Sequence, residues 1–177
     1  MDDESAVKRI AILFIDDRLA GQDGFKSASD AVLNLLASAG ESAGEACESR
    51  SFSVVYQAAV SESRTEIERE MGVALSHARF VLTVGGTGLR PGAYVPEVTE
   101  ALVDRRLHGV ERQVLMQGLR ATNKAGLCRG VIGVTNKGRG VSRLIVNSPG
   151  SSGGIKDTLT VVLPLLDSIF EQLDGLD

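Results

Sequence analysis

The sequence Val81-Leu82-Thr83-Val84-Gly85-Gly86-Thr87-Gly88 is an apolar run that ends in a glycine turn. Its apolar half is typical of a strand that is buried on both faces. Its glycines can adopt positive φ and bring the backbone close to a ligand. An apolar helical pattern begins shortly afterwards, at Val98. A strand, a glycine loop and a helix in this order present backbone N–H groups to an anion, although a glycine turn also arises for steric reasons alone.

The bulk composition is that of one soluble globular domain. The chain has 177 residues, of which 43% are hydrophobic and 24% are charged, and both values are ordinary for such a domain. Lysine and arginine number 19 against 23 aspartate and glutamate residues, which gives a net charge of −4. Because there is no basic surplus to release counterions from a phosphate backbone, we expect no nucleic-acid partner.

The cysteines and histidines are too scattered for a zinc site. Cys47 and Cys128 form no CxxC pair, and His77 and His108 stand apart from them. The apolar run Ile10–Ile15 is too short to cross a membrane, and the acidic amino terminus does not resemble a signal peptide. We therefore expect a cytoplasmic protein with no membrane partner.

Strand and helix patterns alternate along most of the chain. Apolar runs predict strands at Ile10–Ile15, Phe52–Tyr56, Phe80–Val84, Gly130–Val134 and Arg143–Asn147. Helical patterns fall at Ala31–Ala39, Ile67–Leu75, Val98–Arg105 and Ile155–Leu173. The alternation predicts an α/β protein with a doubly wound, mostly parallel sheet and helices on both faces. We expect a single domain over residues 9–173, after a flexible amino terminus at residues 1–8.

Local signals mark where some of these elements begin or end. Ser63 and Glu66 have the spacing of a capping box at a helix start. The basic, glycine-rich segment Thr135–Gly140 predicts a hairpin tip or a mobile loop. Pro164 predicts a bend or a break in the last helix. The segment Gly109–Asn123 has no clear pattern.

Polar turns follow several of the predicted strands. Asp16-Asp17, Gly85–Gly88 and Ser148–Gly154 each come after one, and they form one pocket if they share an edge of the sheet. The glycine loop lacks the Gly-Lys-Ser/Thr ending of a P-loop and the GxGxxG spacing of a dinucleotide fingerprint. The turns instead suit a phosphate that is held by backbone amides and hydroxyls.

These turns resemble the signature motifs of a known family. Thr83–Gly88 followed by Pro96-Glu97 is similar to TTGGTG…TPE, and Asn147–Ser151 is similar to NLPGS. Ile15–Arg18 stands where the family carries a Ser/Thr-Asp after its first strand, and Cys128-Arg129 matches its Ser-Arg. On these motifs the chain resembles the molybdopterin-binding family. Its members include molybdopterin adenylyltransferase, MoaB-type bacterial proteins and the gephyrin G domain.

The resemblance implies a role in molybdenum cofactor biosynthesis. Family members form trimers or hexamers and bind molybdopterin across the two turns, and the adenylyltransferases transfer AMP from Mg-ATP to its terminal phosphate. For Asp17 a solvated loop charge stays an alternative, for Glu97 a helix-start charge, and for the second turn a helix cap. The substrate-binding residues that the motifs imply are Asp17, Gly85, Gly86, Thr87, Gly88, Glu97, Pro149, Gly150 and Ser151.

The sequence departs from the family at positions that matter for catalysis. Gly92-Ala93 stands where the family carries Arg-Asp, whose Asp is important for catalysis, and Phe25–Ala28 replaces an Asp-x-Ser-Gly. Glu62 is the nearest match to a second functional Asp, and it is the candidate catalytic residue and Mg²⁺ ligand unless it is a helix-start charge. One hypothesis is therefore adenylylation of molybdopterin with Mg-ATP. The alternatives are a catalytically silent molybdopterin carrier or interaction scaffold, and a protein that binds another phosphorylated small molecule in the same pocket.

Overall fold

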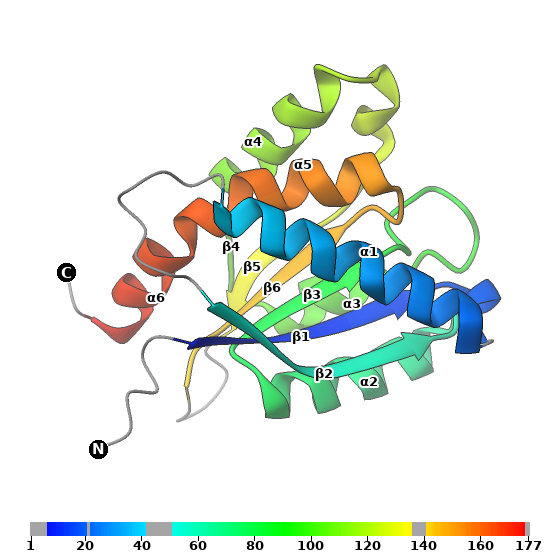
Figure 1. The fold of residues 1–177 in the computed structure, drawn as a ribbon, viewed down its shortest axis with the longest axis horizontal. Helices are drawn as coiled ribbons and strands as arrows, with labels where there is room; N and C mark the ends of the chain where they lie inside the picture. The colour runs from blue at the N-terminus through cyan, green and yellow to red at the C-terminus, as the bar shows by residue number, and fades with distance from the viewer. Residues whose placement is uncertain (1–6, 21, 42–50, 136–140, 176–177) are drawn as a thin grey trace.

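The computed structural model describes residues 7–20, 22–41, 51–135 and 141–175 (Figure 1). They form a six-stranded sheet in the order β2-β1-β3-β6-β5-β4. The parallel strands are β1 (Val7–Ile15), β2 (Ser51–Val60), β3 (Phe80–Val84) and β6 (Arg143–Ser148). The antiparallel strands are β5 (Ile132–Thr135) and β4 (Arg105–Arg106). The predicted single α/β domain with a mostly parallel sheet is confirmed.

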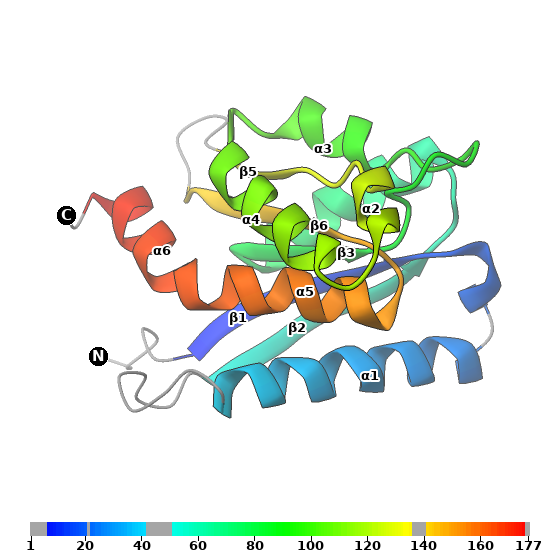
Figure 2. The same cartoon turned by 90° about the horizontal axis from the view of Figure 1, so that it is seen from above.

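Helices cover both faces of the sheet, as predicted (Figure 2). One face carries α1 (Gln22–Glu41), α5 (Ser152–Val162) and α6 (Leu166–Asp174), with α4 (His108–Leu119) packed beside α5. The other face carries α2 (Arg64–His77) and α3 (Val95–Leu102). Short 3-10 helices occur at η1 (Asp17–Ala20), η2 (Asn123–Leu127) and η3 (Leu163–Leu165). The predicted break at Pro164 is confirmed, because η3 separates α5 from α6.

The strand β1 is central and buried on both sides. Ile10, Ile12 and Phe14 enter the hydrophobic cluster under α1 and α5. Ala11 and Leu13 enter the cluster under α2 and α3. All five side chains are fully buried. The strand therefore reads as a continuous apolar run, because alternate side chains enter opposite cores.

The strand order places a crevice at one edge of the sheet. From β1 the chain passes through α1 to β2 on one side, and later through α2 to β3 on the other side of β1. The winding therefore reverses between β1 and β3. Ligands of doubly wound sheets bind outside the carboxyl ends of the strands at such a switch point.

The third predicted helix ends three residues earlier than its apolar pattern indicated. The prediction ran to Arg105, but α3 ends at Leu102. The N–H groups of Asp104 and Leu107 donate to carbonyl groups of β5 over 3.0 and 2.7 Å, which makes the residues between them an edge strand. The segment 109–123, which had no clear pattern, contains most of α4 and the start of η2.

The helix α2 begins where the sequence predicted, but without the predicted capping box. Ser63 is the N-cap residue, yet its hydroxyl makes no cap hydrogen bond. The N–H of Ser63 donates to the carbonyl of Ser61 over 2.7 Å, so it is not available to a glutamate side chain. Glu66 instead accepts from Arg69 over 2.7 Å.

Some predicted features lie outside the described residues. They are residues 1–6 of the predicted flexible amino terminus, residues 136–140 of the predicted hairpin tip or mobile loop, and Cys47. Val7 and Lys8 belong to β1.

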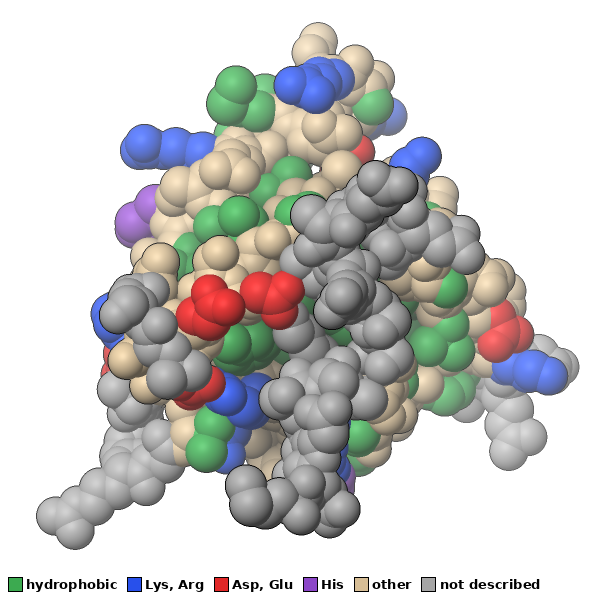
Figure 3. Space-filling model, turned by 60° about the vertical axis from the view of Figure 1, so that its left-hand side comes forward, with side chains coloured by type: hydrophobic (Ala, Val, Ile, Leu, Met, Phe, Trp, Pro, Cys, Tyr) green, Lys and Arg blue, Asp and Glu red, His purple; other side chains and the backbone are tan. Residues whose placement is uncertain are grey.

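Surface charge is dispersed on the face that Figure 3 shows. The Lys and Arg side chains of the described residues lie among polar, acidic and apolar ones and do not gather in one patch. Across the described ranges, no helix combines the length and apolarity needed to cross a membrane.

Candidate functional site

Two turns from neighbouring strands meet at the switch point. β3 leads into the glycine loop, Gly85–Gly88, and β6 leads into the PGS turn, Pro149–Ser151. The N–H of Gly85 donates to the carbonyl of Ser148 over 3.0 Å. A Cβ at Gly150 would lie 3.4 Å from the Cα of Gly85, so the turns pack backbone against backbone. The two turns therefore share one edge of the sheet, which is the condition under which the sequence predicted a single pocket.

Gly85 and Gly86 hold conformations that only glycine adopts easily. Their φ angles are 97° and 67°. A Cβ at Gly85 would lie 2.5 Å from the carbonyl oxygen of Ile15, and one at Gly86 would lie 2.5 Å from Cγ2 of Val95. Both the backbone conformation and the lack of space therefore require glycine at these positions.

Three of the four backbone N–H groups of the glycine loop have no protein acceptor among the described residues. Among the contacts within the described ranges, none engages the N–H of Gly86, Thr87 or Gly88. At the start of α5, the hydroxyl of Ser151 accepts the N–H of Gly154 over 3.2 Å, and the other N–H groups of this first turn have no intrahelical acceptor. Free N–H groups on a glycine loop and a helix N-terminus together suit a phosphate.

An open cavity of about 550 Å³ lies at these turns. This volume lies within the range of small-molecule sites. Apolar side chains of α1 form part of its wall. We call it the strand-end cavity; its polar and backbone lining comes from Asp16, Arg18, Glu62, Gly85–Gly88, Arg90, Lys124, Cys128 and Pro149–Ser152.

A second cavity of about 650 Å³ adjoins the first between α3, α4 and α5, and we call it the α3–α4 cavity. Its wall includes Val114, Leu115 and Glu97. The Oε2 atom of Glu97 is shielded from solvent and has no hydrogen-bond partner among the described residues, although the side chain as a whole is 41% exposed. The walls of the two cavities share Lys124, Cys128, Pro149 and Ser151.

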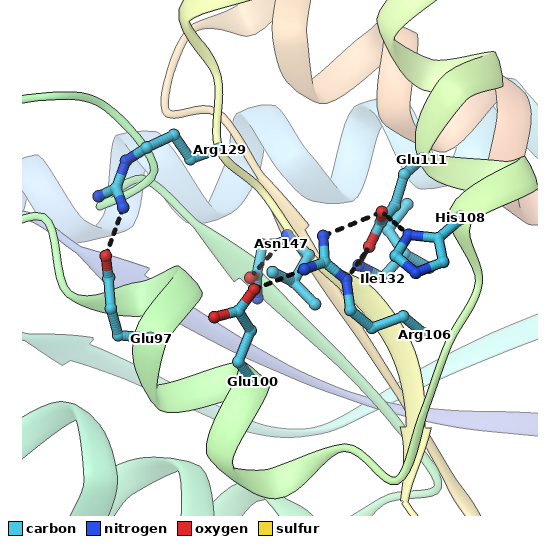
Figure 4. A network of polar contacts seen from close by, with 9 residues as sticks. Glu97, Glu100, Arg106, His108, Glu111, Arg129, Ile132 and Asn147 are labelled. Atoms are coloured by element: carbon cyan, nitrogen blue, oxygen red, sulfur yellow. Dashed lines mark hydrogen bonds and ion pairs between the residues drawn. The ribbon is translucent and has the colours of Figure 1, made fainter.

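Arg129 ties the glycine loop to α3 (Figure 4). Its Nε and Nη2 donate to the carbonyl of Gly88 over 3.1 and 3.0 Å, and Nη2 also donates to the carbonyl of Ala93 over 2.7 Å. Its Nη1 pairs with Glu97, and its backbone N–H donates to the carbonyl of Thr87 over 2.9 Å. Burial acts to raise the pKa of Glu97, but the hydrogen bond from Arg129 helps to hold that pKa below its ordinary value.

Asn147 joins the elements behind the glycine loop (Figure 4). Its Nδ2 donates to the hydroxyl groups of Thr83 and Thr99 over 3.1 and 2.9 Å, and its Oδ1 accepts the N–H of Val131 over 3.0 Å. The side chain is buried, so these hydrogen bonds satisfy polar groups that water cannot reach. The asparagine of this motif therefore connects β3, β6 and α3.

The carboxylates near the strand-end cavity are engaged by other protein groups. Asp16 accepts from Arg18 over 2.6 and 2.9 Å, and this hydrogen-bonded pair holds the pKa of Asp16 below its ordinary value. Asp17 is exposed and accepts the backbone N–H of Glu62 over 2.7 Å. The side chain of Glu62 is only 14% exposed and forms an ion pair with Arg90.

As arranged, these carboxylates do not fit a bound Mg²⁺. That ion needs oxygen ligands in near-octahedral geometry, whereas Asp16 has both oxygens, and Asp17 and Glu62 have one oxygen each, in hydrogen bonds with protein N–H groups. Ala93 has no oxygen to offer from its side chain. Within the described ranges, no group of three or more His, Cys, Asp or Glu residues could hold a metal ion.

The structure brings most of the predicted site residues together. The glycine loop, the PGS turn and Glu62 all line the strand-end cavity. Asp17 is not among the residues that line the cavity; its carboxylate accepts the backbone N–H of Glu62. The preceding residue, Asp16, lines the cavity. Glu97 lines the α3–α4 cavity. The contacts of these residues with a ligand stay predictions.

Two cations of the cavity were absent from the prediction. Arg90 stands two residues after the glycine loop, and this closeness to a predicted anion site was an available signal. Lys124 follows the segment that had no clear pattern, so nothing in the sequence linked it to the site. Both residues line the strand-end cavity.

The fold and the site define a doubly wound α/β protein whose strand ends carry unpaired N–H groups suited to an anion. The chain matches a family described as "probable molybdopterin binding domain" over residues 11–168. It belongs to this molybdopterin-binding domain family of molybdenum cofactor biosynthesis. Molybdenum cofactor biosynthesis protein B of Escherichia coli K12 is 30% identical over 164 residues, which cover 90% of this chain and 86% of that protein.

This chain is also similar to a crystal structure over nearly its whole length and to part of a much longer protein. A crystal structure of a molybdopterin biosynthesis protein from Mycobacterium abscessus superposes with a TM-score of 0.76 and 32% identity, over 96% of this chain and 98% of that one. Gephyrin of Dictyostelium discoideum is 33% identical over 125 residues, which cover 70% of this chain. The matched region spans only 16% of that gephyrin.

Proposed function

We propose that this protein binds molybdopterin, with the terminal phosphate on the free N–H groups of Gly86–Gly88 and of the first turn of α5. The observation that carries the proposal is the pair of adjoining cavities. The strand-end cavity offers N–H groups to a phosphate. The α3–α4 cavity has a largely apolar wall that suits a ring system, and Cys128 lies where the two cavities meet.

Binding without adenylyl transfer is the activity that the geometry supports best. Ala93 is buried and offers no carboxylate. Glu62, which is the nearest match to the second functional Asp of the family, forms an ion pair with Arg90, so its negative charge is already compensated by the guanidinium. The protein would then act as a molybdopterin carrier or as an interaction scaffold, and the implied trimer or hexamer is part of this proposal.

Adenylyl transfer from ATP to molybdopterin is the second candidate function. The position of Glu62 favours it, because a carboxylate that is only 14% exposed still lines the strand-end cavity beside the glycine loop. This candidate requires the ion pair with Arg90 to open when substrates bind.

One incubation separates these functions. The purified chain is mixed with molybdopterin, ATP and MgCl2 without oxygen, and the ligand that stays with the protein is identified by mass spectrometry. We expect unmodified molybdopterin at one molecule per chain. An adenylylated product would establish the second candidate, and a chain that retains no pterin would overturn both.

A further inference from the structure

A phosphate in the strand-end cavity would add negative charge close to Asp16 and Glu62, which already form ion pairs with Arg18 and Arg90. Free N–H groups stabilise such a charge only in part, and phosphate sites commonly add a guanidinium, an ammonium or a metal ion. Because the carboxylates do not fit Mg²⁺, the cations of this cavity have to be sought among its own side chains.

Arg90 is held in place by a β-turn made of Arg90, Pro91, Gly92 and Ala93. The N–H of Ala93 donates to the carbonyl of Arg90 over 3.1 Å, which closes the turn. Gly92 has a φ of 97° in the third position, and proline occupies the second. Proline at the second position and a glycine with positive φ at the third are typical of a type II turn. The turn fixes the backbone conformation next to Arg90, and so restricts where its side chain can lie.

The same turn packs directly against Glu62. A Cβ at Gly92 would lie 3.4 Å from both the carbonyl oxygen and the Oε2 atom of Glu62. The backbone of Glu62 is itself anchored, since its N–H donates to Asp17. One nitrogen of Arg90, Nη2, pairs with Oε1 of Glu62. The turn and the carboxylate therefore orient the guanidinium from two sides.

The guanidinium keeps capacity for a ligand after it has paired with Glu62. Arginine carries five N–H donors in a fork that matches phosphate oxygens. The Arg90 side chain is 72% exposed, so its other donors are open to the solvent. Its charge also reaches the end of β1: the hydrogen bond from Arg18 lowers the pKa of Asp16, and the charge of Arg90 contributes in the same direction.

We propose that Arg90, oriented by Glu62, supplies the positive charge for a ligand phosphate in the strand-end cavity, so that binding needs no divalent cation. In this proposal Arg90 contacts the ligand. Glu62 positions Arg90 and does not bind a metal ion. The inference rests on the proposed function in one respect, that a phosphate occupies this cavity.

The test measures phosphate binding with EDTA and with MgCl2 for the full chain. One probe is molybdopterin, followed by equilibrium dialysis without oxygen. The other is inorganic phosphate, followed by the NMR shifts of the amides of Gly86 and Gly88. We expect both probes to bind in EDTA, and MgCl2 to change neither affinity by more than about twofold, because no cation takes part.

Variants separate the roles of the two side chains. Arg90→Ala weakens both probes by about tenfold to a hundredfold, the loss expected when hydrogen bonds to a charged group disappear. Arg90→Lys gives an intermediate affinity, because it keeps the charge and loses the fork. Glu62→Gln weakens binding in EDTA by about twofold to fivefold, since the neutral amide loses the ion pair that orients Arg90. Arg69→Ala, an exposed cation of α2 outside the cavity, serves as the control and leaves both affinities unchanged.

Opposite results contradict the inference. Binding that appears only with MgCl2 and vanishes in Glu62→Gln would make Glu62 a metal ligand and overturn it. An Arg90→Ala variant that binds as the wild type does would also overturn it. If inorganic phosphate behaves as expected while molybdopterin does not bind, the proposed function fails and the role of Arg90 stands. If neither probe binds, both fail.

Discussion

Gly86, in the loop after β3, occupies a position that accepts no side chain. Its φ is 67°, and a Cβ would lie 2.5 Å from Val95 and 3.1 Å from Ile15. The neighbouring groups belong to the buried cluster under α2 and α3, so they cannot move aside without disturbing the core. The loop is therefore a fixed part of the fold.

Replacing this glycine tests the rigidity of the loop. Gly86→Ala lowers the free energy of unfolding by about 2–4 kcal/mol, since strain at positive φ adds to overpacking. Urea denaturation measures the change. Gly109→Ala in α4, where a Cβ meets nothing within 4 Å, is the control and raises stability slightly. A Gly86→Ala protein as stable as the wild type would show that the loop relaxes freely.

The missing catalytic Asp cannot be restored as a simple pair of substitutions. Gly92 has a φ of 97°, which a side chain such as arginine rarely adopts. Gly92→Arg would also place its side chain against Glu62. A gain-of-activity experiment should therefore use Ala93→Asp alone.

At the residue scale, the sequence predicted the glycine positions and missed the cations. Glycine turns after apolar strands carry a local signal, because spacing and residue type both report on the backbone. The pair of Glu62 and Arg90 joins residues that are 28 positions apart, and no periodicity connects them. Only the fold shows that the two side chains meet at the wall of the strand-end cavity.

Among the elements, α4 depends on Glu111, whose side chain is 14% exposed (Figure 4). Glu111 accepts from Arg106 over 3.1 and 3.0 Å and from the N–H of Ile132 over 2.9 Å, and His108 lies 3.1 Å away. Burial acts to raise the pKa of Glu111, but these hydrogen bonds outweigh it and hold the pKa below its ordinary value. The residue therefore connects α4 to β4 and β5.

This lowered pKa makes part of the stability dependent on pH. The contribution of Glu111 is complete above the ordinary carboxyl pKa near 4.5 and is lost as the pH falls through the lower pKa of the folded state. At neutral pH, Glu111→Gln lowers the free energy of unfolding by about 1–3 kcal/mol. Below a pH of about 4.5 the wild type loses this advantage, and the two curves converge.

Urea denaturation over a series of pH values measures both curves. Glu171→Gln, at an exposed position of α6, is the control and shows little change at any pH. A difference between Glu111→Gln and the wild type that stays constant from about pH 7 to pH 3 would contradict this account of Glu111.

The helices that carry a single apolar stripe were predicted from the sequence, whereas α4 was not predicted. Val110 and Val114 pack toward the core, but Leu115, Met116 and Leu119 are also apolar and are 39%, 64% and 43% exposed. Apolar and polar residues alternate around the circumference of this helix, so no single stripe marks its buried face. The edge strand β4 was missed for another reason, because only pairing with β5 defines its two residues.

On the scale of the whole molecule, the strand order determines where the chemistry can occur. The alternation of strands and helices was enough to predict the doubly wound sheet, and therefore the edge at which polar turns gather. It could not reveal that the turns enclose two adjoining cavities, since these depend on how α3, α4 and α5 pack. The expected trimer or hexamer stays a prediction.

The central claim is that molybdopterin occupies the strand-end cavity. Gly88 lines this cavity, and a Cβ there meets nothing within 4 Å, so Gly88→Leu blocks the cavity while the fold persists. Gly72→Leu, an exposed glycine of α2 with equal space around its Cβ, is the matched control.

Equilibrium dialysis of molybdopterin against the wild type and these two variants is the most direct measurement. We predict one molybdopterin per chain for the wild type and for Gly72→Leu, and an affinity at least about tenfold weaker for Gly88→Leu, because the side chain fills the space of the ligand. Equal binding by all three proteins would place the ligand elsewhere and contradict the account.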